Sequence, residues 1–150
     1  MHSNLVEIKL VENGIKPKRT TDGACAYDVY ARRVEFLSDT EAKIYLGFKI
    51  DTSKLSSVTN MDWGSLLMPR SGWGTKHKFK LDNTVGLIDT DYRGEVIAFA
   101  SWNTKPEDLD AGARVAQLAI TPFYTGDLVI VPELSSSSRG ESGFGSTGHG

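Results

Sequence analysis

The sequence has little of what several large classes of protein require. Its single cysteine, Cys25, cannot form an internal disulfide, and no group of cysteines and histidines has the spacing of a zinc site. No apolar run approaches the ~18 residues of a membrane span, and residues 1–11 carry charges where a signal peptide has its apolar core. These absences predict a cytoplasmic protein with no membrane partner.

An excess of positive charge is also missing. The 150 residues include 17 Lys and Arg against 19 Asp and Glu, which gives a formal net charge of -2. Without a general basic field, nucleic acid is not an expected partner, and any site for an anion has to be local. The length suits a single domain with a sizeable core.

A sustained helical period is missing as well. Apolar residues instead come in short bursts between turn residues, which is typical of an all-β domain. The alternation from Ala42 to Ile50 predicts a strand with one buried face. The segment 53–63 suits either a short helix or a loop. The predicted strands are at 5–11, 27–31, 44–50, 64–68, 96–102, 115–123 and 128–132.

The C-terminal residues 135–150 are mostly Ser and Gly. This stretch has too little apolar surface to fold alone, so we expect a flexible arm after a β body of residues 1–134. The arm nevertheless contains a cation, an aromatic ring and two hydroxyls at Arg139, Phe144, Ser146 and Thr147. Together with the glycine backbone, these groups suit a triphosphate, although a disordered terminus is the simpler interpretation.

Two further segments have groups suited to binding. In the first, Pro69 ends a strand, and Arg70 and Ser71 then stand beside the glycine backbone of Gly72, as in a phosphate cradle or an ordinary strand end. His77 is expected to be a packed imidazole. The second segment, 81–95, is interpreted as a hairpin on which two acids, Asp89 and Asp91, point the same way, or as a surface turn.

Two strand segments have polar residues among apolar ones. Alternation puts Arg114, Ala116 and Leu118 on one face of their strand and Gln117 on the other. Asp28 lies among apolar neighbours, where a carboxylate requires a cationic or amide partner unless it only pins a turn.

Taken in order, five segments resemble the five motifs of the trimeric dUTPases. They are CAYDVY at 25–30, PRSG at 69–72, GLIDTDYRGE at 86–95, RVAQL at 114–118 and RGESGFGSTG at 139–148. The resemblance implies a jelly-roll-like β barrel, a homotrimer with shared active sites, and a C-terminal arm that crosses to a neighbouring subunit.

The resemblance also implies a reaction and a role for each motif. Water attacks the α-phosphorus of dUTP and gives dUMP and pyrophosphate, with Asp89 orienting the water and accepting its proton. Mg2+ is implied as a cofactor that the triphosphate and water hold, without direct protein ligands. The cytoplasm, of a host if the protein is viral, is the implied compartment. The implied binding residues are Arg70, Ser71, Gly72 and Gln117 for phosphate, with Asp28 in support; Asn83, Gly86, Leu87 and Tyr92 for the deoxyuridine; and Arg139, Phe144, Gly145, Ser146 and Thr147 from the arm.

Two other functions stay open at this point. A dCTP deaminase of related fold would need a carboxylate beside the cytosine amino group, and Glu95 is the acid that segment 81–95 offers. A regulatory module that binds nucleotide or protein without turnover is the second alternative. A protein-binding role could also coexist with hydrolysis through the loop at 53–63, within the segment 51–63 that looks longer than in many relatives.

Overall fold

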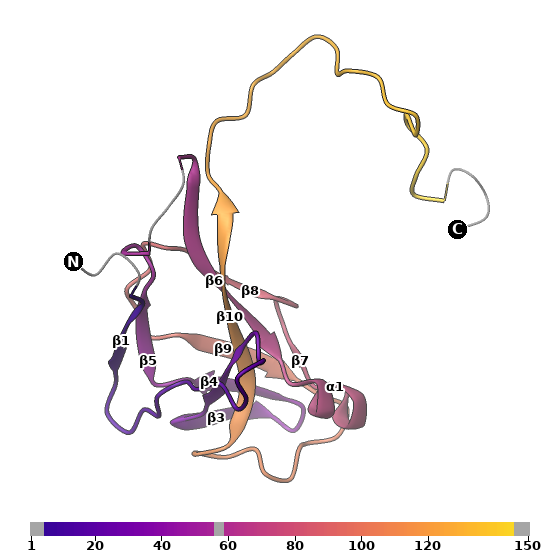
Figure 1. Ribbon diagram of the computed structural model, residues 1–150. Coiled ribbons are helices and arrows are strands. Elements are labelled where there is room, and N and C mark those ends of the chain that lie inside the picture. The colour runs from indigo at the N-terminus through magenta and orange to yellow at the C-terminus, as the bar shows by residue number, and fades with distance from the viewer. Residues whose placement is uncertain (1–4, 56–58, 146–150) are drawn as a thin grey trace.

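The computed structural model describes residues 5–55 and 59–145 and has an all-β fold with antiparallel strand pairs (Figure 1). The strands are β1 (Glu7–Leu10), β2 (Tyr27–Tyr30), β3 (Arg33–Ser38), β4 (Glu41–Tyr45), β5 (Phe48–Asp51), β6 (Met61–Pro69), β7 (Lys80–Leu81), β8 (Gly86–Ile88), β9 (Ile97–Ser101) and β10 (Arg114–Tyr124). In the described ranges the one helix is α1 (Ser71–His77), and no helix has the length and apolar character needed to cross a membrane.

Two four-stranded sheets enclose the core. Their strand orders are β2-β10-β6-β8 and β3-β4-β9-β7, and β1 and β5 form a separate pair. Side chains from both large sheets meet in a single cluster, where Ile44 of β4 and Leu118 of β10 are buried. Burial of each such side chain stabilises the fold by about 1.5–3 kcal/mol. Most of the core comes from these strands, so the all-β prediction is confirmed.

The predicted strand at 44–50 is two strands. Gly47 has a φ of +76°, and a side chain there would come within 2.7 Å of the Gly14 Cα. The chain turns at this glycine and sends β4 into one sheet and β5 to pair with β1. Ile44 and Phe48, on either side of the turn, are both fully buried. The alternation therefore predicted the burial correctly but missed the break.

Helix α1 was not predicted, because its sequence contains two glycines and no apolar period. Packing accounts for it: Trp73 and His77 are buried, and the Trp73 ring lies 5.1 Å from that of Phe79 in an edge-on contact. The His77 Nδ1 atom is 3.0 Å from the Thr104 hydroxyl, which confirms a packed, hydrogen-bonded imidazole. The possible helix at 53–63 is absent from the described part of that segment, where turns lead into β6.

The strand expected at 128–132 does not form. Leu128, Val129 and Ile130 are 89, 80 and 98% exposed, and the chain leaves the body after β10 and extends away from it (Figure 1). A strand needs a partner edge for its backbone groups, and this segment has none within the described part of its own chain.

A partly buried ion pair joins the loop after β8 to the connection between β2 and β3, and its carboxylate also reaches the turn between β4 and β5. Arg32 donates from Nε and Nη2 to the two Glu95 carboxylate oxygens at 2.6 and 2.7 Å, and the Gly47 amide donates to Oε2 at 2.9 Å. The Arg32 hydrogen bond, reinforced by the Gly47 amide and opposed by burial, holds the pKa of Glu95 below its usual value.

We predict that Glu95→Gln lowers the free energy of unfolding by about 1.5–3 kcal/mol at pH 7, because it breaks a charged hydrogen-bonded pair that is mostly buried. Since the folded-state pKa is depressed, the stabilisation is present above the ordinary glutamate pKa of about 4.3 and is lost as the pH falls below it. Urea unfolding at pH 7 and pH 3.5 measures both effects. Glu35→Gln, in an exposed pair with Arg33, is the control. A Glu95→Gln loss no larger than the control at pH 7 would contradict the prediction.

Candidate functional site

A groove of about 610 Å3 lies between the two large sheets. Strand β7 pairs with β9 and strand β8 pairs with β6, so the turn at 82–85 crosses from one sheet to the other. The interpretation of 81–95 as a hairpin is therefore wrong, because its two strands belong to different sheets. The crossing places the backbone of the turn at the mouth of the groove. All of the predicted deoxyuridine residues line it: Asn83, Gly86, Leu87 and Tyr92.

Local hydrogen bonds hold this turn in one shape. The Thr84 amide donates to the Leu81 carbonyl at 2.8 Å, and the Val85 amide donates to the Asn83 carbonyl at 2.7 Å. Thr84 itself has a φ of +68°, an uncommon conformation for a residue with a branched side chain. A turn fixed in this way offers backbone groups in set positions to a flat ligand in the groove.

Asp89 and Asp91 do not act as a pair on a strand. Strand β8 ends at Ile88, and the chain then turns at Thr90 and Asp91, with the Tyr92 amide donating to the Asp89 carbonyl. Asp89 lines the groove, whereas Asp91 lines only a second hollow beside Phe123. The turn thus separates the two carboxylates and leaves Asp89 exposed in the groove, where Asp82 is a second exposed acid.

The Tyr92 side chain is fixed against its own loop. Its hydroxyl donates to the Glu95 carbonyl at 2.8 Å. A Cβ added at Gly94 would lie only 2.3 Å from that hydroxyl oxygen, so the ring requires a glycine beneath it. The ring therefore presents a rigid face beside Asp89.

A second polar cluster lies at the other edge of the β2-β10-β6-β8 sheet. Its hollow, about 320 Å3, is lined by Asp28, Arg70, Ser71, Gly72, Arg114 and Gln117. Arg70 donates to the Arg114 carbonyl at 3.1 Å, and its guanidinium lies 4.7 Å from the Trp73 ring centroid. Gln117 donates to the Pro69 carbonyl at 3.2 Å. Every residue predicted to bind or support phosphate in the body is present here, although Ser71 and Gly72 begin α1 and do not form a loose glycine cradle.

Arg114 is a residue of this cluster that the strand pattern misplaced. A bulge between Arg114 and Ala116 shifts the register against β2. Arg114 therefore does not share the buried face of Ala116 and Leu118, and it reaches Asp28 at 3.4 Å, beside Gln117. Asp28 thus has the cationic partner that its surroundings required. It also accepts a short hydrogen bond from the Thr20 hydroxyl.

The second cluster carries excess positive charge. Two guanidinium groups, Arg70 and Arg114, share one carboxylate, Asp28. Partial burial and then the neighbouring Arg114 charge lower the pKa of Arg70, which remains cationic because an arginine pKa is so high. Fork-shaped donors with unused capacity are suited to bind phosphate oxygens.

The two clusters open on opposite faces of one sheet. Gly86, Leu67 and Leu118 lie in register across β8, β6 and β10 and are buried toward the groove side. The next register position pairs Met68 with Gln117, whose side chains point to the other face because side chains alternate along a strand. No described residue lines both hollows. A small ligand cannot lie on both clusters of one chain without wrapping around the sheet edge.

The predicted arm residues that the structure describes, Arg139, Phe144 and Gly145, line neither cluster. Phe144 is fully exposed, with a φ of +48°, and Arg139 donates from Nε to the Ser142 carbonyl within the arm. Gly145 is exposed and has a φ of +78°. Ser146 and Thr147 lie outside the described residues. Within the described ranges no group of three His, Cys, Asp or Glu side chains is placed to hold a metal ion.

The described chain is an all-β body with a groove between its two large sheets and a separate cationic cluster. Comparisons with known proteins show the family to which it belongs. The dUTPase family model matches residues 12–148, and the chain belongs to that family. It is 38% identical over 138 residues to the deoxyuridine 5'-triphosphate nucleotidohydrolase of Alcanivorax borkumensis, covering 88% of this chain and 87% of the relative.

Solved structures show the same fold. The dUTPase of Staphylococcus bacteriophage 80alpha with dUPNHPP superposes with a TM-score of 0.78 at 24% identity, over 95% of this chain and 98% of the other. A mutant dUTPase from phage phi11 of S. aureus, described for its structural Mg(II) ion, gives a TM-score of 0.71 at 21% identity, over 89% and 100%.

We predict that inorganic pyrophosphate binds the second cluster and that Arg70→Met weakens this binding about 10- to 100-fold, because a charged hydrogen bond is worth about 1.5–3 kcal/mol. Titration calorimetry at two salt concentrations measures the affinity. Arg33→Met removes a cation elsewhere, in an exposed pair with Glu35, and should leave binding unchanged. Equal affinities for Arg70→Met and the unmodified protein would show that the cluster does not bind phosphate.

Proposed function

We propose that this protein hydrolyses dUTP to dUMP and pyrophosphate, at sites that form where subunits of a homotrimer meet. Such an activity limits uracil incorporation into DNA and supplies dUMP for thymidylate synthesis, and its proposed setting is the cytoplasm. The observation that carries the proposal is the arrangement of two complementary half-sites on opposite faces of one sheet, in a chain of the dUTPase family. A groove from one subunit and a cationic cluster from another together complete one site.

The exposed apolar segment after β10 supports assembly. Leu128, Val129 and Ile130 are almost fully exposed in the single chain, and so is Leu134. Several large apolar side chains in sequence are stabilised when another chain covers them and pairs with their backbone groups. In the proposed trimer this segment lies on a neighbouring subunit and leads the arm, residues 135–150, across to that subunit's site.

In the groove, the turn at 82–85 contacts the base and Tyr92 contacts the sugar. Backbone groups from Asn83 to Leu87, held by the hydrogen bonds of the turn, pair with the uracil edge, and the Asn83 amide adds a contact. The fixed turn leaves no space for a 5-methyl group, so thymine is rejected. The Tyr92 ring, fixed over Gly94, packs against the deoxyribose and excludes a 2'-hydroxyl by steric clash.

Asp89 orients the attacking water and accepts its proton. The water oxygen forms a bond to the α-phosphorus while the bond from that phosphorus to the bridging oxygen of pyrophosphate breaks. An exposed aspartate is a weak base, so its contribution comes mainly from holding the water in line with the leaving group.

The second cluster holds the phosphates of the substrate. Arg70, Ser71 and Gly72 bind phosphate oxygens, and a Cβ at Gly72 would meet no atom within 4 Å, so the backbone there is open to a ligand. Gln117 contacts the α-phosphate, and Asp28 orients the network through Arg114. The cluster supplies the cations Arg70 and Arg114, and Mg2+ is proposed to enter with the triphosphate as part of the substrate. Bound to the triphosphate, Mg2+ would supply neutralisation of the negative charge on the leaving pyrophosphate.

The arm closes the proposed site. Phe144 stacks on the uracil, and Gly145 allows the backbone to follow the ring. Arg139, Ser146 and Thr147 contact the γ-phosphate. Closure removes water and adds positive charge where the leaving pyrophosphate develops negative charge. The cost of ordering the arm is therefore offset by contacts in the transition state.

The structure weighs against deamination of dCTP. That reaction needs a carboxylate that exchanges protons beside the base, but the Glu95 carboxylate is held by Arg32 and the Gly47 amide. It also lines a hollow with Lys9 and Lys49, away from the groove. Binding of a protein partner at 53–63 stays a prediction, because residues 56–58 lie outside the described residues.

We predict that the protein releases pyrophosphate from dUTP with Mg2+ and is at least about 100-fold less active on dTTP, dCTP and UTP, because the turn and Tyr92 reject each competitor. Asp89→Asn should bind dUTP with nearly unchanged affinity and lose about 100-fold or more in kcat. Asp91→Asn, two residues away and outside the groove, is the matched control. Ammonia release from dCTP, or full turnover by Asp89→Asn, would contradict the assignment.

We predict that deletion of 138–150 leaves a folded trimer with a severely reduced rate, because the arm contributes transition-state contacts but no core residue. Mass measurement in solution gives the assembly state, and pyrophosphate release gives the rate. Phe144→Ala in the full-length chain separates stacking from the rest of the arm. A truncated protein that keeps the full rate would show that the arm takes no part in catalysis.

A further inference from the structure

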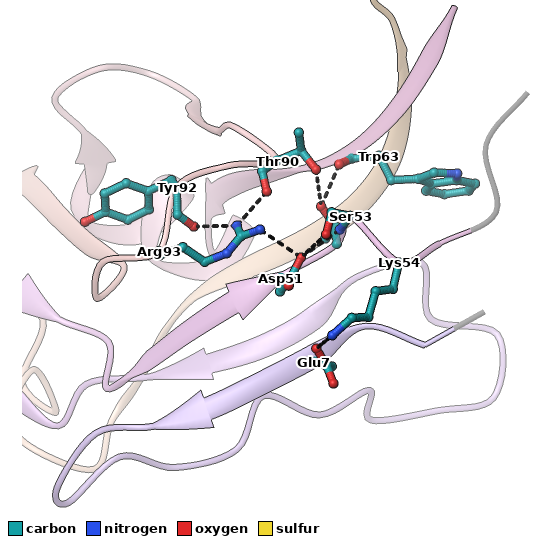
Figure 2. Close-up of polar contacts among 9 residues, drawn as sticks. Glu7, Asp51, Ser53, Lys54, Trp63, Thr90, Tyr92 and Arg93 are labelled. Atoms are coloured by element: carbon teal, nitrogen blue, oxygen red, sulfur yellow. Dashed lines mark hydrogen bonds and ion pairs between the residues drawn. The ribbon is translucent and has the colours of Figure 1, made fainter. Parts of the chain in front are cut away.

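The turn that carries Asp89 is held from outside by the end of β5 (Figure 2). Arg93 donates from Nη1 to the Thr90 carbonyl at 2.7 Å and to the Tyr92 carbonyl at 3.3 Å. Its Nη2 donates to Asp51 Oδ1 at 3.1 Å. One guanidinium therefore bonds two carbonyls of the turn and links the turn to a strand residue 42 positions earlier in the sequence.

Asp51 is itself held in place. Its Oδ1 atom accepts hydrogen bonds from the Ser53 hydroxyl at 2.6 Å and the Ser53 amide at 2.9 Å. These two hydrogen bonds, then the Arg93 and Lys54 charges, lower the pKa of Asp51, with burial opposing them. The carboxylate is thus a fixed, ionised acceptor, and its side chain is only 22% exposed.

A second link runs through the neighbouring residue. The Thr52 hydroxyl donates to the Trp63 carbonyl at 2.5 Å and lies 3.2 Å from the Thr90 hydroxyl. Thr52 is buried. Thr90, the residue next to Asp89, is therefore held at its carbonyl by Arg93 and at its hydroxyl by Thr52.

We propose that Asp51 and Arg93 are positioning residues that set the place of the Asp89 carboxylate for attack on the substrate. This inference rests on the proposed role of Asp89. An ion pair near the surface adds little to stability, so this pair is better suited to fixing geometry than to holding the fold. A displacement of about 1 Å at a reacting group costs up to about 100-fold in rate.

The structure also separates this effect from substrate binding. The residues that read the base precede Asp89 in the chain and are held by their own turn. The Tyr92 ring is held by its packing on Gly94 and by its hydrogen bond to the Glu95 carbonyl, and neither contact involves Asp51. Loss of the Asp51 contact therefore moves Thr90 and Asp89 while the base and sugar contacts stay, so kcat falls and KM does not.

The test compares Asp51→Asn with Glu7→Gln in dUTP hydrolysis. Glu7 is paired with Lys54 and lies opposite Asp51 at the same end of the β1–β5 pair, but away from the turn. It is therefore the matched control (Figure 2). We expect Asp51→Asn to lower kcat about 10- to 100-fold with KM changed less than about twofold, and Glu7→Gln to change neither. An unchanged kcat in Asp51→Asn, or an equal loss in both variants, would overturn the proposal.

A double variant shows whether Asp51 acts through Asp89. In the Asp89→Asn background, Asp51→Asn should cost nothing further, because there is no carboxylate left to position. The same loss in both backgrounds would overturn the proposal. If Asp89→Asn alone keeps the full rate, the proposed function fails with it. If Asp89→Asn is inactive and Asp51→Asn is normal, only the positioning role fails.

A chemical rescue separates positioning from misfolding. Arg93→Ala should lose kcat and recover part of it in millimolar guanidinium, which can occupy the vacated place between the Thr90 carbonyl and Asp51. Arg93→Lys should not restore the rate, because one ammonium cannot reproduce the fork. Thermal melting of each variant checks the fold. A folded Arg93→Ala protein with wild-type kcat, or one that guanidinium does not rescue, would count against the proposal.

Discussion

The antiparallel pairing of β10 with β6 is the constraint on which the rest of the structure depends. It runs without interruption from Ala116↔Pro69 to Tyr124↔Met61. Because side chains alternate along this pairing, one set of residues packs into the core and the next faces outward. The same pairing places Gln117 next to the end of β6, from which Arg70 follows, and supports β8, from which Asp89 follows.

This geometry is the basis for the proposal that one chain holds two incomplete sites. The cationic cluster and the groove are both anchored in the β2-β10-β6-β8 sheet, yet they open on opposite faces of it. Each half is held by its own polar contacts: Asp28 and Arg114 in the cluster, and Asp51 and Arg93 beside the groove. In the proposed trimer, assembly brings together parts that are already held in place, which limits the cost of ordering the site when substrate binds.

The sequence predicted the parts of the fold that depend on local patterns, and it predicted less of what depends on distant contacts. Alternation found the buried faces of β4 and β10, but the turn at Gly47 and the bulge after Arg114 interrupt the period and were missed. Helix α1 forms because Trp73 is buried, which no local propensity indicates. In the same way, the motifs indicated the groove and cluster residues, whereas the Asp51 contact joins segments 42 residues apart and leaves no local signal.

The most direct measurement of the shared site is complementation between two inactive variants. Arg70→Met lacks the phosphate cluster and Asp89→Asn lacks the catalytic carboxylate, so each pure assembly is nearly inactive. In randomly mixed trimers, about a quarter of the sites combine an intact cluster from one chain with an intact groove from another. We therefore predict that co-refolding the two proteins in equal amounts restores about a quarter of the wild-type rate of pyrophosphate release. Mixed trimers that form and stay inactive would contradict the account, because each site would then be built within one chain.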